Sequence, residues 1–143
     1  MFNPSKDEVR QFFCNTWKKS TTGEVLTPLE AMALDWIRLH PEYERDLTDT
    51  ERALGSDYGV EQGRSNPFLH LSMHLSIQEQ TSVDQPPGIR DACQTLIVRL
   101  GSLHDAHHQI MDCLGEMLWA SQRNGTPPDG QAYIRCIRQR AGE

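Results

Sequence analysis

Residues 66–80, NPFLHLSMHLSIQEQ, have the spacing of an amphipathic α-helix. Asn66 suits the N-cap of this helix and Pro67 suits its first turn. On a helical wheel His70 and His74 lie about 40° apart, in the middle of the apolar arc. A buried imidazole needs partners for both ring nitrogens, and a metal ion supplies one of them. The stretch therefore predicts a helix that carries two metal ligands into the protein interior.

Residues 102–117, SLHDAHHQIMDCLGEM, repeat this spacing on a second predicted helix. His104 and His108 lie four residues apart. Asp112 and Glu116 follow at the same interval of four residues. The four positions wind slowly around the helix, from the edge of the apolar arc toward solvent. Six histidines in 143 residues would give about 0.25 such histidine pairs by chance, whereas two pairs occur. The predicted metal ligands are His70, His74, His104 and His108, with Asp112, Glu116 and His40 as supplements.

His40 ends a third predicted helix, which begins at a capping box formed by Thr27 and Glu30. Pro41 directly follows His40 and ends the helix there. The apolar stripe of this helix comprises Leu29, Met32, Ala33, Trp36, Leu39 and His40. Two interpretations of His40 stay open: a further metal ligand, or a residue favoured by the negative end of the helix dipole. Glu44 lies four residues later and either accompanies His40 or is solvated.

Other residues of these helices are predicted to have structural roles. His107 points about 60° away from His104 and is left out of the ligand set. Gly115 is expected to allow a neighbouring helix to approach closely. Trp17, Trp36 and Trp119 are predicted to pack in the core.

Helix signals recur along the chain, and no stretch shows the alternation of a β-strand. Further N-caps are predicted at Ser5, Ser102 and Asp129. Connecting loops are predicted at residues 55–65, 84–88 and 124–128. Amphipathic helices joined by short loops pack as antiparallel neighbours. We predict an all-α fold, a single-domain antiparallel bundle of about seven helices over residues 1–143.

Composition limits the partners that we expect. Twenty acidic residues against 14 basic ones give a net charge of −6, which argues against nucleic acid and anionic membranes. A protein partner or a homo-oligomer is left open.

The four scattered cysteines lack a C-x-x-C pair and predict free thiols in a reducing compartment. No signal peptide and no apolar run of roughly 20 residues is present, so a soluble cytoplasmic protein is predicted.

The histidine pattern predicts a metal and leaves the reaction open. The sequence from His70 to His74 lacks the glutamate of the H-E-x-x-H motif, which disfavours a zincin protease. Paired histidines with nearby carboxylates suit iron, zinc, manganese or nickel. An open coordination position would allow a metal-dependent enzyme that activates water or dioxygen. The alternatives are a metal carrier or sensor without turnover, and a non-catalytic protein-interaction module whose buried histidines are hydrogen-bonded.

Several stretches of the chain together resemble one protein family. They are MFNPSKDEVRQFFCNTW, LTPLEAMALDWIRLHPEY, NPFLHLSMHLSIQEQ, SVDQPPGIRDAC, CLGEMLW and GTPPDGQAY. The chain resembles, over nearly its whole length, a family of small proteobacterial proteins known only as domain of unknown function 1841. The resemblance implies a soluble bacterial protein and no particular activity. The metal hypothesis therefore depends on the histidine spacing alone.

Overall fold

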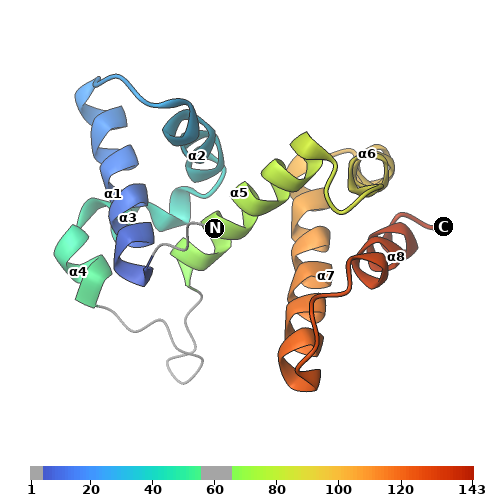
Figure 1. The fold of residues 1–143 in the computed structure, drawn as a ribbon. Helices are drawn as coiled ribbons and strands as arrows, with labels where there is room; N and C mark the ends of the chain where they lie inside the picture. The colour runs from blue at the N-terminus through green and yellow to red at the C-terminus, as the bar shows by residue number, and fades with distance from the viewer. Residues whose placement is uncertain (1–4, 56–65) are drawn as a thin grey trace. The chain divides into compact units, whose positions relative to one another are not determined.

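The computed structural model describes residues 5–55 and 66–143, and the chain divides into two compact units (Figure 1). Unit 1 comprises residues 1–75 and unit 2 comprises residues 76–143. Within the described ranges the secondary structure is eight α-helices and one 3₁₀ helix, without a strand, which confirms the all-α prediction. Most of the predicted loop at residues 55–65 lies outside the described residues.

Five helices and the start of a sixth build the described part of unit 1. They are α1 (Lys6–Thr22), α2 (Pro28–Arg38), the 3₁₀ helix η1 (Pro41–Tyr43), α3 (Glu44–Thr48), α4 (Thr50–Gly55) and the first part of α5 (Pro67–Val83). Unit 2 contains the remainder of α5, α6 (Ile89–Leu100), α7 (Leu103–Asn124) and α8 (Gly130–Arg140). The boundary between the units therefore falls inside α5.

The predicted caps set the starts of five helices. Side-chain oxygens of Ser5, Thr27, Asn66, Ser102 and Asp129 each accept hydrogen bonds from backbone N–H groups in the first turn that follows. At Ser5 and Thr27 the glutamate three residues later also accepts from the cap's own N–H, which completes a capping box. Local sequence signals therefore define these helix starts before any packing is considered.

The core of unit 1 is apolar, with one buried cation. Phe13, Trp36, Phe68 and Leu71 are among the side chains that pack there. Arg10 is only 3% exposed, and its Nη1 donates to the backbone oxygen of Ala53 at 2.8 Å. Its guanidinium also lies over the Phe68 ring. The hydrogen bond to Ala53 joins α1 to α4, and the contact with Phe68 joins α1 to α5.

Unit 2 contains a covalent cross-link that the sequence analysis did not predict. Cys113 on α7 and Cys136 on α8 form a disulfide, so the prediction of four free thiols is wrong. The physical reason is that α7 and α8 pack together and bring the two Cα atoms to 5.8 Å, a normal disulfide separation. Cys14 and Cys93 are free, as predicted, and both are buried.

Three expectations about packing are also wrong. Trp119 is 61% exposed, with the Arg123 guanidinium over its ring, so it is a surface residue. Apart from its chain neighbours and the backbone of its own helix, nothing in the described structure lies within 4 Å of a Cβ added at Gly115, so no close helix approach requires this glycine. Leu29 and Leu39 are about half exposed because α2 buries its Leu34 and Ile37 side instead.

No helix in the described part of the chain has the length and apolarity needed to span a membrane.

Candidate metal centre

Three histidine rings meet in unit 1, two of them buried and the ring of His70 half-buried. His40 follows α2, whereas His70 and His74 lie one turn apart on α5. The Nε2 atoms of His40 and His74 are 3.2 Å apart, and these two residues are 4% and 0% exposed. The ring of His70 stands edge-on to both, with centroid distances of 4.6 Å to His40 and 4.9 Å to His74. We call these three residues the histidine triad.

A carboxylate fixes the orientation of His40. Its Nδ1 lies 2.7 Å from Oε1 of Glu42, and a carboxylate can only accept. The Nδ1 hydrogen therefore points to Glu42, and in the neutral ring the lone pair is on Nε2. Nε2 is the nitrogen that faces His74. A carboxylate behind a histidine in this way is typical of metal-binding histidines, because it holds the ring and increases its basicity.

Aromatic side chains enclose the triad. Trp36 stacks on His74 at a centroid distance of 4.1 Å, and Tyr43 stacks on His40 at 4.9 Å. Burial raises the pKa of Tyr43 to about 12, and the negative charges of Glu42 and Asp46 add to this shift. The Tyr43 phenol is therefore neutral at physiological pH. These stacked rings cover one face each of His74 and His40.

The second predicted pair lies on α7 in unit 2. The His104 and His108 rings are 4.3 Å apart between centroids, and one ring nitrogen of each lies within 4.8 Å of the other. Both residues are half-buried. The spacing of four residues thus places both rings on one side of α7, as predicted. Each ring can offer one nitrogen as a ligand.

His107 differs from its two neighbours, because it is almost completely buried. Burial lowers its pKa to about 4, and the nearby His104 and His108 add to this decrease. The His107 ring is therefore neutral at physiological pH.

The two predicted carboxylate ligands are both exposed and interact with a cation. Arg140 on α8 lies 3.2 Å from Oδ2 of Asp112 and 3.7 Å from Oε1 of Glu116. Arg140 also donates to Oε1 of Gln109 at 2.7 Å. Through these contacts Asp112 and Glu116 help to join α7 to α8.

Sequence reasoning missed Glu42 and considered Glu44 as the companion of His40 instead. The structure places Glu44 at an exposed position in α3. The 3₁₀ turn that starts at Pro41, directly after His40, holds the segment in which Glu42 contacts His40, and no spacing rule in the sequence pointed to this pair.

Comparison with known proteins identifies the family. Searches of curated proteins and of solved structures found no match. A family model described as "Domain of unknown function (DUF1841)" matches residues 5–139, which include both units and all the histidines discussed. The chain therefore belongs to the DUF1841 family, as its sequence motifs suggested.

Proposed function

We propose that this protein binds a transition-metal ion through the histidine triad of unit 1. The observation that supports this function best is the 3.2 Å separation of the His40 and His74 Nε2 atoms in a buried, aromatic-walled site. In a tetrahedral zinc site each nitrogen lies about 2.0–2.1 Å from the ion, so two ligand nitrogens are roughly 3.4 Å apart. The observed separation is close to this value.

The surroundings of the triad also suit a metal. Glu42 directs the Nε2 lone pair of His40 toward His74 Nε2, which lies within hydrogen-bond distance, and the ring of His70 packs edge-on beside this pair. Imidazole nitrogen suits iron, zinc, manganese and nickel to different degrees, and zinc and nickel bind more tightly than manganese in the general order of affinities. We expect zinc or nickel to bind most tightly.

The histidine spacing carries a further part of this proposal. It predicts that His104 and His108 are ligands of the same ion, with Asp112 and Glu116 as supplements. The triad with His104 and His108 would offer five nitrogen ligands, enough for a closed site suited to a carrier or a structural ion. Fewer protein ligands would leave a position for water, as an enzyme requires. The variants below separate these cases.

Metal analysis of natively purified protein is the direct test. We expect close to one transition-metal ion per chain, and less than about 0.1 ion after purification and after incubation with zinc and nickel would contradict the proposal. The double variant His40→Gln/His74→Gln should lose the metal. His107→Gln is the matched control, because it changes a histidine of similar burial that is outside the proposed site, and it should keep the metal.

Titration with cobalt(II) tests the same site without any substitution. Cobalt absorption distinguishes four-coordinate from six-coordinate ions, so the wild-type spectrum reports how many ligands the ion has. If His104→Gln/His108→Gln leaves both the affinity and the spectrum unchanged, these two residues are not ligands. If metal never binds and the triad variants change only the stability, the histidines form a hydrogen-bonded core, which is the interaction-module alternative.

A further inference from the structure

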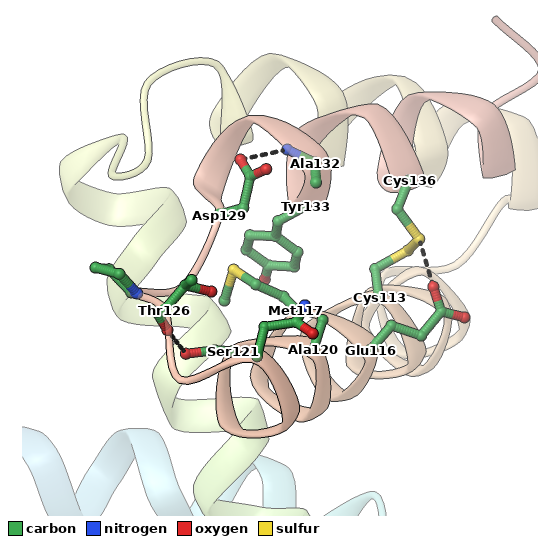
Figure 2. Close-up of a pocket in the computed structure, with 12 residues that line it drawn as sticks. Cys113, Glu116, Met117, Ala120, Ser121, Thr126, Asp129, Ala132, Tyr133 and Cys136 are labelled. Carbon is green, nitrogen blue, oxygen red and sulfur yellow. Dashed lines mark hydrogen bonds between the residues drawn. A yellow bond between two sulfur atoms is a disulfide. The ribbon is translucent and has the colours of Figure 1, made fainter.

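A cavity of about 340 Å³ lies in unit 2 beside the disulfide between α7 and α8. Figure 2 shows Cys113 and Cys136 at one side of this cavity, next to Glu116, and Tyr133 and Asp129 farther along it. Both cysteines of the disulfide line the cavity. A molecule that enters it therefore lies next to the disulfide.

The two cysteines differ in accessibility. Cys113 is 1% exposed, whereas Cys136 is half-buried. A nucleophile must reach one sulfur and displace the other along the line of the bond. Access therefore favours attack on the Sγ of Cys136, with Cys113 as the leaving group.

We propose that the Cys113–Cys136 disulfide is a thiol-exchange site for small thiols that carry no negative charge. The thiol loses its proton to solvent, and its thiolate attacks Cys136. A bond forms between the two sulfurs as the bond to Cys113 breaks, and the Cys113 thiolate takes a proton from water. A second thiol then attacks the mixed disulfide, which releases the oxidised small-molecule disulfide and leaves Cys136 reduced.

The charge preference follows from the cavity wall. Among the described residues that line the cavity, Glu116 and Asp129 are acidic and none is basic. Oε2 of Glu116 lies 3.7 Å from the Cys136 sulfur, a contact drawn as a dashed line in Figure 2. An oxidised sulfur has no hydrogen to donate, so this carboxylate repels the approaching thiolate, and a further negative charge on the small molecule adds to the repulsion. After reduction the Cys136 thiol can donate to the same oxygen. Arg140, 3.7 Å from the other Glu116 oxygen, reduces this repulsion only in part.

Helix α8 has contacts that do not depend on the disulfide. Tyr133 and Ile137 are buried, and the Tyr133 hydroxyl donates to Oε1 of Gln80 at 2.7 Å. These interactions hold α8 in unit 2 after reduction, so Cys136 stays near Cys113. The exchange is therefore reversible.

Mapping of the mixed disulfide in the native full-length protein tests the site. The protein is treated with cysteamine in the presence of a chelator, and the reaction is stopped with acid. The protein is then unfolded, all free thiols are blocked with a maleimide, and the peptides are analysed by mass spectrometry. We expect cysteamine on Cys136 and maleimide on Cys113. Cys14 and Cys93 serve as internal controls, because they are free thiols and should carry maleimide only. An adduct on Cys113, or reaction only after unfolding, would overturn the proposal.

Three thiols of different charge test the preference: cysteamine, 2-mercaptoethanol and 2-mercaptoethanesulfonate. With rates expressed per thiolate, we expect the cationic thiol to react fastest and the sulfonate slowest. Glu116→Gln should speed the sulfonate reaction about threefold, the effect of one charge at about 6 Å in water. Asp91→Asn, which removes an exposed carboxylate that does not line the cavity, should have no effect. Equal rates for all three thiols, or equal effects of both variants, would refute the charge preference.

Discussion

Unit 1 and unit 2 are similar in length and are both helical, but different interactions hold them together. The described part of unit 1 has no disulfide; a buried arginine, a Lys19–Glu30 ion pair and the histidine triad supply its specific polar contacts. In unit 2, a disulfide links the two C-terminal helices directly. This contrast leads us to expect unit 1 to respond to metal and unit 2 to respond to thiols.

Metal removal should have the largest effect, and we expect it in unit 1. An ion present at 1,000 times its Kd stabilises the native state by about 4 kcal/mol. Chelation should therefore increase hydrogen exchange in α2 and at the start of α5. Exchange resolved by peptide is the measurement, and the His107→Gln variant is the control. Equal exchange with and without chelator would mean that no metal supports unit 1.

Reduction of the disulfide should have the next largest effect, and we expect it in unit 2. The two cysteines are 23 residues apart in sequence, and closing a loop of that size contributes about 3 kcal/mol in the chain-entropy model. Urea unfolding of wild type and of Cys113→Ala/Cys136→Ala would measure this loss. Exchange in α1 and α2 should remain unchanged. Equal loss of protection in α1 would contradict the contrast between the units.

Replacement of the buried arginine should destabilise unit 1 by a smaller amount. Arg10→Met keeps much of the side-chain volume but leaves the Ala53 carbonyl without this donor. A buried acceptor that loses its partner costs about 2 kcal/mol. The measurement is the free energy of unfolding in denaturant. The control is Arg38→Met, which makes the same replacement at an exposed position of α2. If both variants have wild-type stability, the Arg10 interaction contributes little.

The smallest effect that we predict is pH-dependent and involves Glu30. Hydrogen bonds from the Thr27 backbone and from Lys19 lower the pKa of this carboxyl group below its ordinary value of 4.5. The stabilisation is therefore complete above pH 4.5 and is lost as pH falls through the lower folded-state pKa. Glu30→Gln should be slightly less stable than wild type at pH 7, with the difference vanishing in strong acid. A difference that stays constant with pH would show that ionisation of Glu30 is not the cause.

Much of the secondary structure could be predicted because its signals are local. Ser5, Thr27, Asn66, Ser102 and Asp129 cap helices as predicted, since each needs only the backbone of the next few residues. The four-residue spacing likewise placed His70 beside His74 and His104 beside His108. Both results follow from helix geometry alone.

What the sequence could not predict depends on contacts between distant segments. The pairing of Cys113 with Cys136 requires α7 and α8 to pack with those two positions opposed, and no local pattern contains that information. The approach of His40 to His74 joins residues 34 positions apart. The exposure of Trp119 shows the same limit, because an apolar face indicates burial only when another element covers it.

The stacking of Trp36 on His74 has a practical consequence. An indole in contact with an imidazole loses fluorescence when that ring becomes charged or binds a paramagnetic ion. Trp36 is 4% exposed and stacks at 4.1 Å, whereas Trp119 lies on the surface of unit 2. Nickel or cobalt should therefore quench a blue-shifted component of the emission and leave the red-shifted component of Trp119 as an internal reference. The protein thus carries its own optical reporter of occupancy, which requires no label.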